Sequence, residues 1–210
     1  MKKIFAMLFL VFAMGSLSAK DVSYINQGQV CKAPYNKKAI LRNDRLFVDD
    51  FLTLHSLLKM AQPRSVFEIG TCTGEGTLIM KNAIGNNVVY SLELPLNEST
   101  YDIGVAGKMC YLPYVQIVGN SMTLDYTEFY PIEAWFIDGA HEYTFVLHET
   151  KQAVLSAPSI IIWHDADIPE VFQAIKDGLD DRDDYLLYRV NNTRIAFAIP
   201  CTSQLVEVLR

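Results

Sequence analysis

The stretch from Val66 to Thr77 has the residue types and spacing of a loop that holds a nucleotide-like cofactor. An apolar run contains Glu68 near its end, three glycines follow at positions 70, 74 and 76, and a helical pattern begins. Glycine lets the chain turn sharply and lets a ligand approach where a Cβ would block it. The first turn of a helix leaves backbone N–H groups without partners in the helix. We therefore expect a cofactor at the carboxyl end of this strand.

Charges near the loop narrow the choice of cofactor. A carboxylate at Glu68 can hold an ammonium group, directly or through water, and would repel a pyrophosphate. Glu93 ends the next expected strand, about 20 residues past the loop, where an acid can accept hydrogen bonds from ribose hydroxyls. The dinucleotide pattern Gly-x-Gly-x-x-Gly is absent, and no tyrosine has a lysine four residues later. A nicotinamide oxidoreductase is therefore the weaker alternative.

A second group of polar residues follows two later strands: Asp138, His141, His164 and Asp165. The carboxyl ends of neighbouring parallel strands meet at one edge of a sheet, which is the expected place for an active site. Either histidine could act as a base near neutral pH. The two aspartates could instead coordinate Mg²⁺, although Ala166 stands where a further ligand beside Asp165 would be expected.

These groups need a framework that brings several strand ends together. Short apolar runs alternate with segments whose apolar residues recur three and four apart, a pattern typical of βαβ units and a mainly parallel sheet. Asn191-Asn192 indicates a tight turn and a closing hairpin, so one strand should run antiparallel. The expected strands are 65–70, 88–93, 115–118, 134–138, 159–164, 185–190 and 194–199, and the expected helices are 44–62, 74–83, 144–156 and 168–179.

Five segments together resemble a known family. Residues 68–76 resemble motif I of class I S-adenosylmethionine (SAM) methyltransferases, and Glu93 stands where that family has its ribose-binding acid. Residues 119–121 resemble its Gly-Asp-Ser segment, with asparagine in place of aspartate. Residues 136–143 and 161–165 resemble the fourth- and fifth-strand motifs of the subgroup often filed as methyltransferase family 24. The resemblance runs from about residue 66 to residue 199.

The resemblance implies a Rossmann-like three-layer α/β sandwich with a seven-stranded, mainly parallel sheet and one antiparallel strand. It implies methyl transfer from SAM, with oxygen of a small molecule or glycan precursor as the expected acceptor, and metal ligation by Asp138 and Asp165 if Mg²⁺ takes part. The expected catalytic residues are His141, His164 and Asp138. The expected cofactor-binding residues are Glu68, Gly70, Thr71, Gly74, Gly76, Glu93, Asn120, Ser121 and Asp138.

Composition limits the kind of partner. The 210 residues suffice for one α/β domain, which we place at 44–210, and half of them are hydrophobic. The formal net charge is −6, and no cluster of lysine and arginine appears, so nucleic acid is not the expected partner. Four cysteines are scattered without a Cys-x-x-Cys pair, which disfavours a zinc site and leaves any disulfide pairing open. The sequence leaves the oligomeric state open.

The N-terminus has the pattern of a secretory signal peptide. Two lysines precede an unbroken apolar run from Ile4 to Gly15, and small residues follow up to Ala19. We expect residues 1–19 to be a signal peptide or membrane anchor, the only membrane contact, and residues 20–43 to be a lead-in segment. Export fits poorly with a cofactor made in the cytosol. The alternatives are an anchored or cytoplasmic enzyme, or an exported ligand-binding protein that has lost catalysis.

Overall fold

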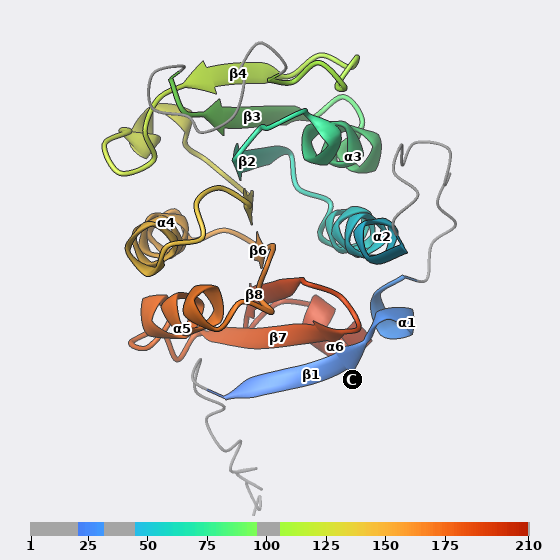
Figure 1. Cartoon of the computed structure of the whole chain (residues 1–210). Coiled ribbons are helices and arrows are strands. Elements are labelled where there is room, and N and C mark those ends of the chain that lie inside the picture. Colours follow the sequence, from blue (N-terminus) through green and yellow to red (C-terminus); the bar gives the residue numbers. More distant parts are fainter. Residues whose placement is uncertain (1–20, 32–44, 96–105, 210) are drawn as a thin grey trace, which may run out of the picture.

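The computed structural model describes residues 21–31, 45–95 and 106–209. Strands and helices alternate along most of this part of the chain (Figure 1). The strands are β1 (Val22–Asn26), β2 (Ser65–Ile69), β3 (Val88–Glu93), β4 (Val115–Val118), β5 (Ala134–Ile137), β6 (Ile160–Trp163), β7 (Tyr185–Asn191) and β8 (Ala196–Pro200). The helices are α1 (Gln27–Val30), α2 (Arg45–Ala61), α3 (Glu75–Ile84), the 3-10 helix η3 (Tyr126–Phe129), α4 (Tyr143–Leu155), α5 (Pro169–Gly178) and α6 (Leu205–Leu209).

All eight strands form one sheet in the order β1-β7-β8-β6-β5-β2-β3-β4. Only β8 runs antiparallel to its neighbours, β6 and β7, which confirms the expected single reversed strand. The expected count of seven strands is wrong, because β1 adds an eighth. It pairs in parallel with β7 over five residues, from Val22 opposite Leu187 to Asn26 opposite Asn191. The described part of segment 20–43 thus contains a strand and a short helix, α1.

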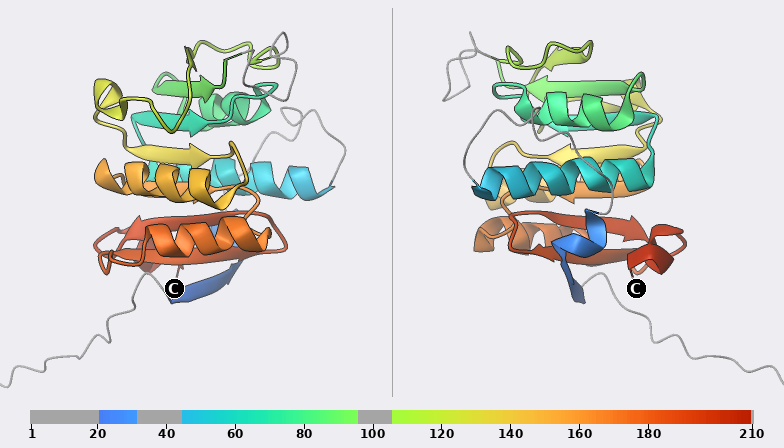
Figure 2. Two further views of the ribbon diagram at one scale, coloured as in Figure 1. Left: turned by 60° about the vertical axis from the view of Figure 1, so that its left-hand side comes forward. Right: turned by 90° about the vertical axis from the view of Figure 1, so that its right-hand side faces the viewer.

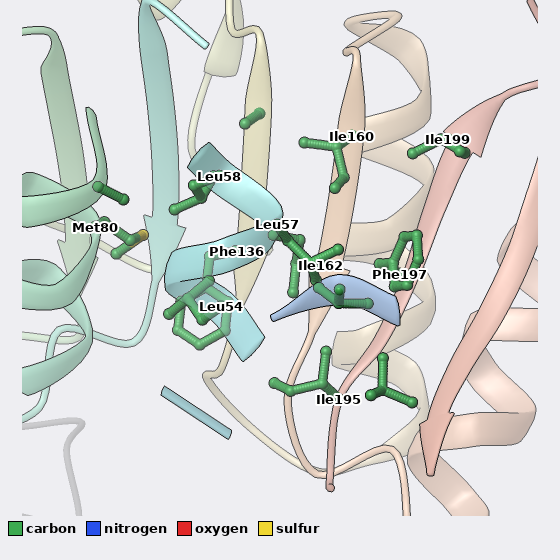
Figure 3. Packing of buried hydrophobic residues seen from close by; sticks show 14 of the residues in the cluster. Leu54, Leu57, Leu58, Met80, Phe136, Ile160, Ile162, Ile195, Phe197 and Ile199 are labelled. Carbon is green, nitrogen blue, oxygen red and sulfur yellow. The ribbon is translucent and has the colours of Figure 1, made fainter. Parts of the chain in front are cut away.

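Helices cover both faces of the sheet, as expected for a three-layer sandwich (Figure 2). Successive residues of a strand point to opposite faces, and the two hydrophobic cores follow this alternation. Phe67 and Trp135 pack in the core shared with α4 and α5, whereas Val66 and Phe136 pack in the core shared with α2 and α3. Figure 3 shows the second core, where Leu54, Leu57 and Leu58 of α2 face Ile160 and Ile162 of β6.

The parallel pairing of β3, β2, β5 and β6 determines where the polar residues lie. β2 pairs with β3 and β5, and β5 pairs with β6, all in parallel. The residues that follow these four strands therefore gather at one edge of the sheet. The expected strands here agree with the observed ones to within one residue at each end, so this edge is the one that the sequence predicts.

Two sequence-based expectations lie wholly or partly outside the described residues. The signal peptide or anchor at 1–19 is one, and most of the lead-in segment is the other. Within the described ranges, no helix is both long enough and apolar enough to cross a membrane.

Candidate functional site

Glycines shape the loop after β2. Gly70 has φ 96° and Gly74 has φ 88°, values that L side chains rarely adopt. Gly70 is also confined by contact, because a Cβ there would lie 2.1 Å from the backbone oxygen of Asp138. The loop therefore runs directly along the end of β5. Since α3 starts at Glu75, a tight loop and the first turn of a helix meet at the predicted edge.

The buried carboxyl group of Glu68 lies next to the glycine loop and the first turn of α3. Its side chain is 1% exposed, and its Oε2 accepts hydrogen bonds from Thr77 Oγ1 at 2.5 Å and from the Ser91 hydroxyl. A Cβ on Gly76 would lie 2.7 Å from Glu68 Oε1, so glycine at 76 makes room for the carboxylate. Burial raises the pKa of Glu68 to about 8, although the two hydroxyl groups oppose the shift. Direct contact between Glu68 and a cofactor stays a prediction.

Glu93 lies beside the loop at the end of β3. The Cys72 N–H donates to Glu93 Oε2 at 2.6 Å, and the Leu94 N–H donates to Oε1 at 3.1 Å. Glu93 is only partly buried, so its carboxylate can fix the loop and still offer lone pairs to a ligand. Thr71 is buried, and its hydroxyl is 2.6 Å from that of Ser91, which makes it part of the framework under the loop.

A turn in the connection from β3 to β4 packs on the glycine loop. The Gly107 N–H donates to the Cys72 carbonyl at 2.9 Å, and the Met109 N–H donates to the Thr73 carbonyl at 2.8 Å. A Cβ on Gly74 would lie 2.7 Å from the Cα of Gly107, so the two backbones touch. Sequence reasoning missed this contact, because the segment from 95 to 113 has no regular pattern.

Asn120 and Ser121 shape the turn after β4. Asn120 Oδ1 accepts a hydrogen bond from the Met122 N–H at 2.9 Å, and the Ser121 carbonyl accepts one from the Tyr126 hydroxyl at 3.0 Å. Behind them lies Glu149 of α4, a fully buried carboxyl that the sequence did not single out. Burial raises the pKa of Glu149 to about 7, and the Ser121 hydroxyl opposes the shift. The role of Asn120 and Ser121 toward a cofactor stays a prediction.

The ends of β5 and β6 bring the second group of polar residues together, as predicted. His164 Nδ1 lies 3.1 Å from Asp138 Oδ1 and 3.0 Å from Asp165 Oδ2, and His141 Nε2 lies 2.9 Å from the same Asp165 oxygen. Asp165 has φ 49°, a strained value of the kind found at functional sites. The side chain of His141 is 52% exposed and that of His164 is 5% exposed. Only His141 therefore faces solvent to a large extent.

Two residues outside the expected set complete this cluster. Asp50 of α2 is fully buried, and its Oδ2 lies 3.1 Å from His164 Nε2. Arg194, in the turn between β7 and β8, donates to Asp50 from its backbone N and its Nε, each at 2.8 Å. Its Nη1 lies 3.3 Å from Asp165 Oδ1. No local signal could reveal these roles, because the partners are 29 to 144 positions apart.

The close charges shift the ionisation of the cluster. Burial lowers the pKa of His164, but the neighbouring carboxylates, Asp138 first, outweigh it and raise the value to about 12. The hydrogen bond with Asp165 raises the pKa of His141 against its partial burial. Burial favours the neutral form of Asp165, yet His141 and His164 hold its pKa far below its ordinary value. These shifts favour the charged forms of His164 and Asp165, which lie 3.0 Å apart.

The donor atoms of the cluster fit a divalent cation poorly in this arrangement. Asp138, His141 and Asp165 each offer a ligand atom, all within 4.8 Å of one another. However, Asp165 Oδ2 already has two imidazole partners and Oδ1 has Arg194. A dication at Asp165 would also lie close to the guanidinium of Arg194, whose permanent positive charge would repel it. Metal ligation by Asp138 and Asp165 stays a prediction that this geometry disfavours.

Comparison with known proteins places the fold. No family model and no curated protein matches the sequence. A solved structure of a putative caffeoyl-CoA O-methyltransferase from Staphylococcus aureus is similar, with 17% identity, a TM-score of 0.52, and coverage of 82% of this chain and 88% of that one. A putative O-methyltransferase from Klebsiella pneumoniae has 15% identity, a TM-score of 0.51, and coverage of 78% and 84%.

A third similar structure is the MycE methyltransferase from the mycinamycin biosynthetic pathway, solved with Mg and S-adenosylhomocysteine (SAH). It has 17% identity and a TM-score of 0.51, and the match covers 73% of this chain and 49% of that one. Identities this low speak for the fold alone. The chain has the Rossmann-like α/β fold that these class I methyltransferases share.

Proposed function

We propose that the chain is a SAM-dependent methyltransferase of the family 24-like subgroup, acting on oxygen of a small molecule or glycan precursor. One observation carries the proposal. Glu93 holds the Cys72 N–H of the glycine loop at 2.6 Å and remains partly exposed. A carboxylate that both fixes the loop and faces outward suits a ligand with ribose hydroxyls next to the loop. The similar structures support SAM-dependent methylation, since one is a putative O-methyltransferase from Staphylococcus aureus and another is MycE, a methyltransferase solved with SAH.

The chain's own residues would bind and orient the cofactor. Gly70 and Gly74 present backbone without side chains, so a ligand can approach the loop closely. Glu93 would accept hydrogen bonds from ribose hydroxyls. When bound, SAM supplies a methyl group already activated on its sulfonium. The protein then has mainly to place an acceptor oxygen in line with that methyl group and to remove the acceptor's proton.

His141 is the best candidate for removing that proton. It is the more exposed of the two predicted histidines, and Asp165 holds its ring by Nε2 at 2.9 Å. His164 has carboxylates at both ring nitrogens and is almost fully buried, so we assign it a positioning role. Asp138, with its side chain 27% exposed, would help to orient the acceptor. The hollow beside these residues, lined in part by Val146, Trp163 and Val171, has a volume of about 10 Å³, which holds a single water molecule and no organic acceptor.

A second candidate is an exported ligand-binding protein without catalysis. The basic and apolar N-terminal pattern favours it, because SAM is made in the cytosol. Both candidates predict a ligand at the glycine loop. Only the first predicts methyl transfer. A screen of methyl acceptors, carried out after the binding measurement, therefore distinguishes the two candidates.

Isothermal titration of SAM and SAH into the full chain, with NAD as a control ligand, tests the proposal. We expect micromolar binding of SAM and SAH, no binding of NAD, and strong weakening in the variant E93A. The matched control is E207A, because Glu207 is an exposed glutamate on α6, which follows the reversed strand β8 and so starts at the opposite edge of the sheet. A folded wild type that binds neither SAM nor SAH would refute the enzyme assignment.

A further inference from the structure

We propose that Arg194, anchored by Asp50, is a fixed positive charge built into the acidic cluster, and that it takes the place of a divalent metal there. The proposal deepens the proposed function, since it says how the methyltransferase site balances its carboxylates. Its ion-binding part can be tested whether or not the chain binds SAM. Neither Asp50 nor Arg194 belongs to the motifs by which the sequence resembles methyltransferases.

The first step is the anchoring of Arg194. Asp50 receives hydrogen bonds from the backbone N and the Nε of Arg194, each at 2.8 Å, and Nη2 lies 2.7 Å from Asp50 Oδ2. Asp50 is fully buried. The guanidinium also lies over the ring of Phe47, 4.2 Å from its centroid. Multiple bonds to one buried carboxylate and an aromatic face fix the position of the guanidinium, whose charge is permanent.

The second step is the contact between the Arg194 guanidinium and the carboxylate of Asp165. Arg194 Nη1 lies 3.3 Å from Asp165 Oδ1, with side-chain exposures of 15% and 14%. The other oxygen of Asp165 faces His141 at 2.9 Å and His164 at 3.0 Å. Both oxygens of this carboxylate thus have nitrogen partners from the chain itself. A metal ion bound to Asp165 would have to share a carboxylate oxygen with one of these nitrogen donors, close to the guanidinium charge.

The third step concerns His164, which has carboxylates on both sides. Its Nε2 is 3.1 Å from Asp50 Oδ2, and its Nδ1 is 3.1 Å from Asp138 Oδ1 and 3.0 Å from Asp165 Oδ2. Each ring nitrogen of His164 therefore lies within ion-pair distance of a carboxylate, and the ring fills the space between all three.

The chain itself provides a nitrogen partner for each carboxylate of the cluster. Three carboxylates, Asp50, Asp138 and Asp165, face one guanidinium and two imidazoles. Neutralising carboxylates and orienting groups around them are tasks that a divalent ion performs at other sites. Here residues of α2 and of the β7–β8 turn perform these tasks, although the two segments are far apart in the sequence. We infer that the site needs no bound metal.

Binding of Mn²⁺ to the full chain, followed by the electron paramagnetic resonance signal of the free ion, tests the proposal. We expect the wild type to bind no Mn²⁺ at the cluster below millimolar concentrations. The variant R194M should bind it at least tenfold more tightly, because a unit charge about 6 Å from the dication is removed, and even the dielectric constant of water gives that factor at this distance. R64M is the matched control. Arg64 forms an exposed ion pair with Glu133 just before β2, at the opposite edge of the sheet, so R64M should behave as the wild type.

Further variants keep the test decisive. R194Q retains an amide donor toward Asp50, and it serves if R194M does not fold, as judged by near-ultraviolet circular dichroism. Micromolar Mn²⁺ binding by the wild type that D165N abolishes would overturn the proposal, as would a folded R194M or R194Q with unchanged affinity. Wild-type binding that D165N leaves intact lies outside the cluster and agrees with the proposal. A chain that binds no SAH refutes the proposed function and leaves the Mn²⁺ result to decide this inference.

Discussion

Replacing Gly70 with alanine should destabilise the protein strongly through the backbone of the neighbouring strand. The new Cβ would lie 2.1 Å from the Asp138 carbonyl oxygen, 2.7 Å from its carbon and 3.0 Å from the Cα of Gly139. None of these atoms belongs to a flexible side chain. Moving them would strain the bond from the Asp138 N–H to the Ile69 carbonyl, now 2.9 Å. The left-handed φ of 96° adds a second penalty.

The magnitude follows from these two terms. Left-handed backbone costs an L residue about 1–2 kcal/mol, and overpacking against rigid neighbours costs about 1–3 kcal/mol. We therefore expect G70A to lower the free energy of unfolding by about 2–5 kcal/mol, which corresponds to a fall in Tm of about 4–20 °C for a domain of this size.

A matched variant separates the two terms. Gly85 also has a positive φ, 65°, but a Cβ there would meet nothing within 4 Å. G85A should therefore lose only a backbone term, about 1–3 kcal/mol for φ 65° and ψ −121°, a combination that glycine alone adopts readily. Urea denaturation followed by circular dichroism, with the m-value checked for constancy, measures both variants. If G70A proved no less stable than G85A, the close approach of the loop to β5 would not exist in solution, and our account of Gly70 would be wrong.

Three further predictions concern the carboxyl groups and the helix packing near the site. E93A should weaken SAH binding by about 10- to 100-fold and E93Q by less, because a neutral amide can still accept the Cys72 N–H; calorimetry distinguishes them. Because burial raises the pKa of Glu68 to about 8, its protonated form favours folding below its ordinary pKa of about 4.5, and this contribution is lost as the pH rises through about 8. E68Q should therefore be more stable than the wild type near pH 9 in urea denaturation, with the gap closing near pH 5, and a gap independent of pH would contradict this. Y143F removes the bond to Asp177, 2.8 Å long, and should cost about 1 kcal/mol in thermal unfolding without changing SAH affinity.

The sequence predicted most of the sheet, because the central strands have strong local patterns. Ile160–Trp163 is an unbroken apolar run, and Val88–Glu93 was predicted with its observed bounds. The sequence did not predict β1, because Val22–Asn26 mixes polar and apolar residues and lacks the apolar run of the central strands; only one of its residues is buried. What makes it a strand is its pairing with β7, which no local pattern contains.

The candidate site likewise contains some residues that the sequence predicted and others that it did not. Residues that follow strands, such as Glu93 and Asp138, were predictable, because strand ends in a parallel sheet meet at one edge. Asp50 was not, since an acid on an amphipathic helix is usually exposed. Arg194 follows a turn signal, and nothing else in the local sequence indicates its place in the cluster. Their roles arise only when α2 and the β7–β8 turn come together in the folded chain.

The pairing of β1 with β7 has a consequence for the order in which the chain assembles. Asn26 and Asn191 contact each other although they are 165 positions apart. At a synthesis rate of about 5–20 residues per second, β1 waits roughly 8–33 s for its partner to be made. During that interval β1 has no partner strand to pair with, so its docking against β7 comes late in assembly. Such long-range pairing also slows folding.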